Sequence, residues 1–293
     1  MFTKKLIFIS QKESIISNCK LKIFDLEENR LFIRSIPLRI IPSLKGLSQI
    51  SSLNSLFLCG SNNYNSSCFL ININIYSTDI KSKILVNSAY SHYNPILFLL
   101  QEDILIVIGG KKQIFCEKYS INLNQWRDMP FLPEERYKGN VLLNEHNSHL
   151  YLFGGLTNNK YNESILILNL RSVSGWEKIF VKNGYLLQRY GFINFSFGID
   201  SENKNDNLIY IFGGKINKRE KYDFILEYDY ENNVINKKNV EYNEMPIFDI
   251  STVADINKNK IAFTDNDENI YIIEKKILGF LLLVQRMHNI FNI

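Results

Sequence analysis

Three short apolar runs of this chain each end in a pair of glycines. The runs are rich in Ile, Leu, Tyr and Phe, and the pairs are Gly109-Gly110, Gly154-Gly155 and Gly213-Gly214. β-branched and aromatic residues favour strands, whereas glycine permits the positive φ that ends a strand in a tight turn. Three copies of one strand ending, roughly 50 residues apart, indicate a repeat architecture. The chain is therefore expected to be built from repeated β units.

The stretch after the first glycine pair contains an ordered set of further residues. They are Tyr119, Trp126, Met129-Pro130, Pro133 and Arg136. This order resembles the kelch repeat, in which a diglycine is followed by a tyrosine on the third strand, a tryptophan on the fourth, a proline-rich turn and an arginine that opens the next unit. The resemblance implies a β-propeller, with Trp126 and Trp176 on outer strands and packed inward against their own blades.

The same pattern can be followed into units that lack the glycines. Apolar residues recur in pairs at nearly constant spacing: Phe24 with Leu31, Ile73 with Ile80, Tyr119 with Trp126, Leu168 with Trp176, Tyr228 with Ile235, and Ile273 with Phe280. Sustained helical periodicity is lacking, so helix should be scarce. The sequence predicts a single all-β domain over residues 1–293, a six-bladed kelch-type β-propeller with four antiparallel strands in each blade.

The two ends of the chain complement one another in this scheme. The first unit begins with what would be a second strand, over residues 5–10, and has no first strand. Residues 286–293 follow the last unit as a surplus apolar strand that opens with Arg286 and His288, similar to the openings of other units. We expect the C-terminal strand to close the ring, with residues 287–292 beside residues 6–9. Closure would remove exposed sheet edges.

Composition limits the partners and the location of the chain. A formal net charge of +4 is too small to indicate nucleic-acid binding, and the longest apolar stretch is far too short to cross a membrane. The chain is expected to be a monomer in the cytoplasm, with the nucleus as an alternative. Because no secretory signal is recognisable, the cysteines are expected to be structural thiols: Cys19, Cys59, Cys68 and Cys116.

Residues for catalysis are scarce. The four histidines are His92, His146, His149 and His288. His92 and His288 fit a kelch position that packs between blades. His146 and His149 lie in a predicted turn where Glu145 is the only nearby candidate for the further ligands that a metal site needs. No cofactor or metal is therefore expected. Some kelch-like propellers act on sugars through carboxylates and arginines in the central channel, so a sialic acid mutarotase-like enzyme using Arg136, Arg189 and Glu134 or Glu135 is the alternative function. The simpler interpretation is that both arginines anchor blades.

One face of the predicted propeller is rich in basic residues and tyrosines. In antiparallel blades, the second-to-third and fourth-to-first connections emerge on the same side. This arrangement favours a module that binds a protein or peptide, possibly an acidic one, by charge steering and aromatic contacts. Ordinary solvated lysines would give the same pattern. The predicted contact residues are Lys111, Lys112, Arg136, Lys160, Tyr161, Arg189, Lys215, Lys218 and Arg219.

Overall fold

The structure is a computed structural model of the chain. It describes residues 5–9, 20–25, 28, 30–35, 48–51, 54–60, 66–73, 80–101, 103–144, 148–195, 208–215, 224–239, 241–242, 252–257, 260–264, 270–275 and 282–286. In these residues nearly all regular structure is β-strand, and the helical content is the short 3-10 turn η2 (Gly184–Leu187). The expectation of an all-β chain with little helix is confirmed for the described residues.

The strands form sheets in chain order, and each sheet is named here by a Roman numeral. Sheet I contains β1 (Lys5–Ile9), β2 (Lys20–Asp25) and β3 (Arg30–Ser35). Sheet II contains β4 (Ser48–Ser51), β5 (Ser55–Cys59), β6 (Cys68–Asn72) and β7 (Lys81–Ile84). Sheet III contains β8 (Ile96–Leu100), β9 (Ile104–Gly110), β10 (Gln113–Ser120) and β11 (Gln125–Met129).

The second half of the chain continues the pattern. Sheet IV contains β12 (Asn140–Asn144), β13 (His149–Phe153), β16 (Ser164–Asn169) and β17 (Glu177–Phe180), with a small hairpin of β14 (Leu156–Thr157) and β15 (Lys160–Tyr161). Sheet V contains β18 (Tyr190–Phe195), β19 (Leu208–Lys215), β20 (Phe224–Asp229) and β21 (Val234–Asn239). Sheet VI contains β23 (Thr252–Asn257), β24 (Lys260–Thr264), β25 (Ile270–Lys275) and β26 (Leu282–Arg286), with β22 (Glu241–Tyr242) added to β26.

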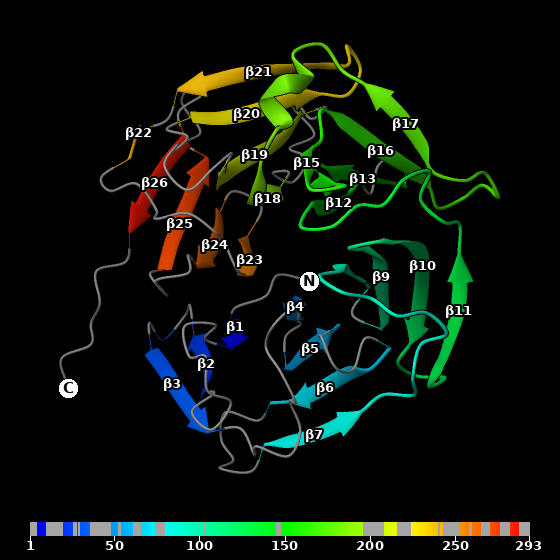
Figure 1. The fold of residues 1–293 in the computed structure, drawn as a ribbon. Coiled ribbons are helices and arrows are strands. Elements are labelled where there is room, and N and C mark those ends of the chain that lie inside the picture. The colour runs from blue at the N-terminus through cyan, green and yellow to red at the C-terminus, as the bar shows by residue number, and fades with distance from the viewer. Residues whose placement is uncertain are drawn as a thin grey trace.

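The sheets are arranged around a common centre as in a β-propeller (Figure 1). Neighbouring strands within each sheet pair antiparallel, and the parallel pair of β22 with β26 is an addition at the outer side of sheet VI. The strands β4, β8 and β12 contact one another in sequence at the central side, as do β12 and β18. β1 contacts both β4 and β23. The expected propeller architecture is therefore confirmed.

The number of complete blades differs from the sequence prediction. The described residues form five blades of four or more strands, whereas sheet I has three strands, so the prediction of six four-stranded blades is wrong. The missing strand of sheet I was assigned to residues 287–292, which lie outside the described residues. The expected closure of the ring by this strand, beside residues 6–9, stays a prediction.

Apolar clusters fill the spaces between neighbouring sheets. Because side chains alternate across a strand, a blade buried on both faces packs one set of residues against each neighbour. In β10, for example, Cys116 belongs to the cluster shared with sheet IV, whereas Tyr119 belongs to the cluster shared with sheet II. Phe8 and Phe24 of sheet I pack in the same way with residues of sheet VI. The core is thus distributed between the blades.

The cysteines differ from the sequence expectation. Cys59 and Cys68 are directly opposed in the antiparallel pair of β5 and β6, with Cα atoms 4.3 Å apart, and they form a disulfide. The prediction of thiols is therefore wrong for these two residues, because the strand register, which the sequence spacing does not reveal, places them face to face. Cys116 is a buried thiol, and burial raises its pKa to about 12. Cys19 lies outside the described residues.

Candidate functional site

Three residues at equivalent positions of sheets III, IV and V hold the ends of the second strands. His92, Arg136 and Arg189 precede the first strand of their sheet, and all three side chains are buried. Each contacts the carbonyl of the first glycine of the diglycine in its own sheet. His92 Nδ1 lies 2.6 Å from Gly109 O, Arg136 Nη1 donates to Gly154 O at 2.9 Å, and Arg189 Nη1 donates to Gly213 O at 2.9 Å. We call these three side chains the clamp residues.

The glycine pairs also connect each sheet to the next. The backbone N–H of Gly110 donates to Arg136 O at 3.0 Å, and that of Gly155 donates to Arg189 O at 3.1 Å. Gly109 has a φ of 54°, and a Cβ there would lie 2.7 Å from Arg136 O. Only glycine therefore fits this positive-φ position against the neighbouring chain. The repeated diglycine is thus a hydrogen-bonded link between consecutive blades.

The first clamp uses a buried acid on the third strand. His92 Nε2 lies 3.0 Å from a carboxylate oxygen of Glu117, and both side chains are almost fully buried. Glu117 also accepts the backbone N–H groups of Ala89 and Tyr90 at 2.9 and 3.3 Å. Both ring nitrogens of His92 face oxygen atoms, so the imidazole satisfies both contacts as a donor when it carries its second proton. This confirms the structural role expected for His92, while His288 lies outside the described residues.

The second clamp is the most extensive. Arg136 donates to Ser164 O at 3.2 Å, to Ser164 Oγ at 3.1 Å and to Glu134 at 2.6 Å. Glu134 also accepts a hydrogen bond of 2.6 Å from Lys178 Nζ on β17. Burial raises the pKa of the Glu134 carboxyl, but the hydrogen bonds from Lys178 and Arg136 outweigh it and leave the pKa below its usual value. Glu134 therefore carries a negative charge that holds two cations together.

These contacts bury two of the residues that the sequence predicted to touch a partner. Arg136 and Arg189 both have 0% exposure. Arg189 donates from Nε to Leu186 O at 3.0 Å, and its guanidinium lies 5.6 Å from the ring centroid of Phe224. Neither arginine can reach a partner without breaking the blade contacts. The proposal that they bind a partner is corrected: they anchor blades.

The remaining predicted residues of sheets III and IV come together on one side of the molecule. This side, called the loop face, carries the β9–β10 turn with residues 111–112, the connection of residues 130–139, and the hairpin of residues 156–161. Lys112 and Lys160 are exposed, whereas Lys111 and Tyr161 are half-buried. Lys111 Nζ lies 6.0 Å from the ring centroid of Tyr137, which brings the first two segments into contact.

Glu135 joins the three segments of the loop face. Its carboxylate accepts the backbone N–H of Lys112 at 2.6 Å and the backbone N–H of Asn158 in a shorter contact. Its backbone carbonyl accepts the hydroxyl of Thr157 at 2.6 Å. The Glu135 charge is therefore directed at backbone donors, while Lys111, Lys112 and Lys160 form no ion pair within the described residues. The lysines on these fixed loops give a local excess of positive charge.

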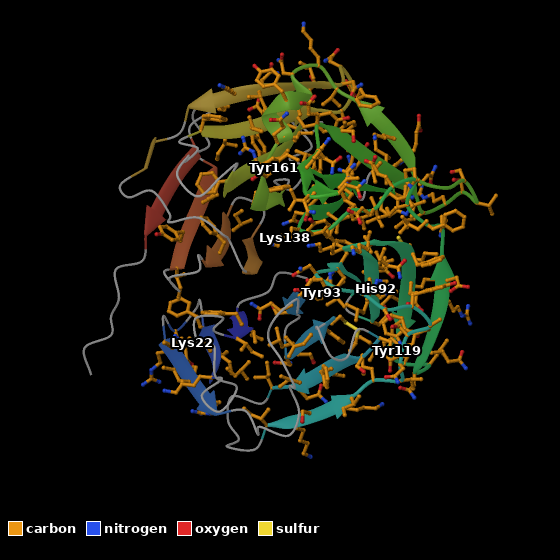
Figure 2. All side chains as sticks on the ribbon, viewed as in Figure 1. Lys22, His92, Tyr93, Tyr119, Lys138 and Tyr161 are labelled. Atoms are coloured by element: carbon orange, nitrogen blue, oxygen red, sulfur yellow. A yellow bond between two sulfur atoms is a disulfide. The ribbon has the colours of Figure 1, made fainter. Side chains whose placement is uncertain are left out.

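Two exposed or partly exposed residues of this surface were missed by the sequence analysis. Lys138 is exposed, and Tyr93 is half-buried with its carbonyl accepting the Lys111 N–H at 2.7 Å. Figure 2 places Tyr93 and Lys138 toward the centre of the propeller and Tyr161 farther out, in the small hairpin of sheet IV. A signal was present, because an aromatic residue directly follows each clamp residue: Tyr93, Tyr137 and Tyr190. Lys138 directly follows Tyr137, so it could have been found from the same pattern.

The other predicted contact residues lie in sheet V and its connection. The backbone of Lys215 at the end of β19 pairs with Tyr190 of β18. Lys218 and Arg219 lie outside the described residues. The structure thus brings Lys111, Lys112 and Lys160 onto linked loops.

The residues considered for catalysis have other contacts. Arg136 and Glu134 form one buried network, and Glu135 binds backbone donors of two loops. His149 packs beside Tyr151, with ring centroids 6.3 Å apart, and His146 lies outside the described residues. Within the described residues, no group of three or more His, Cys, Asp or Glu side chains could hold a metal ion. Arg136, Glu134 and Glu135 are thus engaged in contacts between segments of the fold, and the sugar-directed alternative stays a prediction.

Comparison of the sequence with models of protein families and with curated proteins finds no match. Among the described residues, no helix has the length and apolar character needed to cross a membrane. The fold and the loop face are therefore the observations on which a function can be argued.

Proposed function

We propose that this propeller is a protein-interaction module of the kelch type that binds an acidic peptide or protein segment on its loop face. The observation that carries this proposal is the gathering of Lys111, Lys112, Lys138 and Lys160 on loops that Glu135 holds together. Loops on a rigid scaffold are common recognition sites, and complementary charge raises the rate of encounter. Tyr93, whose carbonyl accepts the Lys111 N–H, and Tyr161, which follows Lys160 in β15, add aromatic surface next to these lysines.

The clamp geometry supports the kelch-type assignment within this proposal. The clamp residues contact the first glycine carbonyl in three sheets. Tyr119 and Tyr228 each donate to an asparagine five residues later, and Trp126 and Trp176 each donate to a carbonyl that follows the preceding sheet. We propose no enzymatic activity, because Arg136 is committed to backbone carbonyls and to Glu134. Lys215, Lys218 and Arg219 remain part of the proposed surface on the basis of the sequence pattern.

The test uses an array of acidic peptides and matched peptides in which Asp and Glu are replaced by Asn and Gln. The wild-type protein should retain acidic peptides and release their amide counterparts. The variant Lys112→Glu/Lys138→Glu/Lys160→Glu reverses three exposed side chains on the loop face. It should lose binding by roughly tenfold or more and show a weaker dependence on salt.

A matched variant controls for the change in total charge. Lys81→Glu/Arg171→Glu/Lys182→Glu reverses three exposed cations away from the three segments of the loop face. This control should keep the binding and the melting temperature of the wild type. If both triple variants lose binding equally, or if amide peptides bind as well as acidic ones, the proposed function is wrong.

A further inference from the structure

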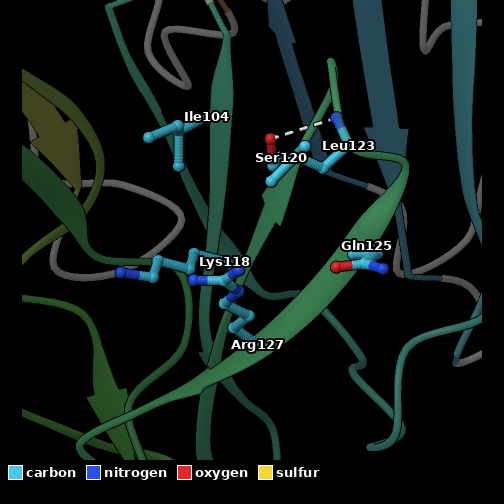
Figure 3. A pocket seen from close by; sticks show the side chains of 6 residues that line it. All are labelled: Ile104, Lys118, Ser120, Leu123, Gln125 and Arg127. Atoms are coloured by element: carbon cyan, nitrogen blue, oxygen red, sulfur yellow. Dashed lines mark hydrogen bonds between the residues drawn. The ribbon is translucent and has the colours of Figure 1, made fainter.

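A separate pocket lies on sheet III at the end away from the loop face. It has a volume of about 150 Å³ and is lined by Ile104, Lys118, Ser120, Leu123, Gln125 and Arg127 (Figure 3). Lys118 stands opposite Ile106 in the strand register, and Ile106 packs in the cluster shared with sheet IV. The pocket is therefore on the side of sheet III that faces sheet IV, beside the β10–β11 turn.

Two positive side chains lie directly opposite each other in this pocket. Lys118 of β10 pairs with Arg127 of β11 in the antiparallel register, and both residues are exposed. Like charges at directly opposed positions of a sheet destabilise it. Neither side chain forms an ion pair with any residue that the structure describes. An anion placed between them would remove this repulsion.

The other lining residues add hydrogen-bond donors and apolar surface. The Ser120 hydroxyl oxygen accepts the backbone N–H of Leu123 at 3.3 Å, which leaves the hydroxyl hydrogen available for donation (Figure 3). Gln125 stands opposite Ser120 in the register and presents an exposed carboxamide. Leu123 is 59% exposed, and Ile104, which also lines the pocket, is half-buried. The apolar side chains thus lie toward one end of the pocket and the two cationic side chains toward the other (Figure 3).

We propose that this pocket binds a single anionic side chain of a peptide, with an adjacent apolar residue of that peptide covering Leu123 and Ile104. The anion, a carboxylate or a phosphate, lies between the ammonium group of Lys118 and the guanidinium group of Arg127. The pocket is smaller than the roughly 300–1,000 Å³ typical of sites for whole small-molecule ligands. This site is independent of the loop face, and it lies at the other end of the blade.

The test measures amide chemical shifts at residues 118–127 during titration with short peptides at low salt. The probes are acetyl-Leu-Glu-Leu-amide, the same peptide with Gln in place of Glu, and the same peptide with phosphoserine in place of Glu. The Glu or the phosphoserine peptide should produce saturable shifts with a Kd on the order of millimolar, and the Gln peptide should produce none. The stronger of the two acidic peptides identifies the anion.

Matched variants show whether the two cations are responsible. Lys118→Gln/Arg127→Gln should weaken binding of the acidic peptides by roughly tenfold. Lys81→Gln/Arg171→Gln makes the same change in total charge and should bind as the wild type does. In the peptide-free protein, Lys118→Gln alone should raise the melting temperature, because it removes the repulsion from Arg127.

Three outcomes would overturn the proposal. Lack of saturable shifts in the wild type would show that the pocket binds neither anion. Equal loss of binding in the two double variants would show that net charge alone is responsible. Equally strong binding of inorganic phosphate and of the acidic peptides would show an anion site without a peptide contact at Leu123.

Discussion

At the scale of residues, the clamp position accepts different side chains as long as a buried donor reaches the glycine carbonyl. His92, Arg136 and Arg189 all meet this requirement. Their second partners on the third strand differ: Glu117 for His92, Ser164 for Arg136, and the ring of Phe224 for Arg189. A buried charge is tolerated when it is fully paired, and removal of one partner leaves the others unsatisfied. The clamps should therefore matter for stability more than any lysine of the loop face.

We predict that Arg136→Ala lowers the free energy of unfolding by roughly 3–5 kcal/mol, as expected when one partner of a buried network is removed. The change would leave the carbonyls of Gly154 and Ser164 without their donor and Glu134 without one of its two cations. Urea unfolding followed by tryptophan fluorescence measures this loss. Lys112→Ala, at an exposed position nearby, should change stability by less than about 0.5 kcal/mol. Equal losses of unfolding free energy in the two variants would contradict the structural role of Arg136.

The ionised Glu134 side chain should make part of the stability depend on pH. Because the folded pKa is lowered, its contribution is complete above the unfolded value of about 4.3 and is lost as the pH falls through the folded pKa. The difference in unfolding free energy between the wild type and Glu134→Gln should therefore shrink when the pH is lowered from 6 to 3. Glu177→Gln, at an exposed position, provides the control. A difference that stays constant over this range contradicts the assignment.

At the scale of elements, the described parts of the connections after β7, β11, β17 and β21 each contact the outer strand of the next sheet. Trp126 donates from its indole N–H to Val86 O at 2.5 Å, and Trp176 donates to Pro130 O at 2.9 Å. Val86 and Pro130 both follow the outer strand of the preceding sheet. In sheet V, the backbone N–H of Ile235 on the outer strand donates to Lys182 O, in the connection from sheet IV, at 3.0 Å. In sheet VI, β22, in the connection from sheet V, pairs with the outer strand β26. The outer strands are thus linked from one sheet to the next.

The two tryptophans should therefore contribute unequally to stability. Trp176 is 8% exposed, whereas Trp126 is only half-buried. Trp176→Ala should cost roughly 3–5 kcal/mol, and Trp126→Ala should cost less. Trp176→Phe keeps most of the apolar area but removes the donor to Pro130, so it should cost about 1 kcal/mol. Thermal unfolding of the three variants checks this order, and a larger loss for Trp126→Ala than for Trp176→Ala would reverse the interpretation.

The sequence predicted these elements in part. The register pairs Phe24 with Leu31 and Tyr119 with Trp126, as the spacing indicates. The links from the tryptophans to the preceding sheet were not predicted; both were expected to pack only against their own blades, and Trp176 lies just before β17. Spacing along the chain reports pairing within a hairpin, whereas contacts between sheets depend on how the blades twist and stack. The Cys59–Cys68 disulfide lies within one hairpin and was missed for a different reason: its register depends on where the loop between β5 and β6 begins and ends, which the sequence does not mark.

At the scale of the whole molecule, the sequence predicted the propeller architecture and the connections that form the loop face. It predicted less well which residues are exposed on that face. The antiparallel order of strands places alternate connections on one side, and the structure brings Lys111 close to Tyr137 there. Arg136 and Arg189 were assigned to this surface because they lie in connections from a fourth strand to the next first strand, although blade anchoring was the simpler interpretation. Both arginines are buried because they contact a glycine carbonyl and a residue of the third strand. These partners come close to the arginines only when the blade has folded. The count of five complete blades depends on strands near the chain ends, where the repeat pattern is weakest.

Hydrogen–deuterium exchange of the wild-type protein, with and without the tightest acidic peptide from the array, tests most directly whether the loop face is the binding surface. The peptide should slow exchange at residues 111–112, 137–138 and 156–161, which Glu135 brings together on that face. The Lys112→Glu/Lys138→Glu/Lys160→Glu variant should show no such protection at the same peptide concentration. Protection confined to residues 118–127 or to the outer strands, with no change in the loop-face segments, would contradict this account.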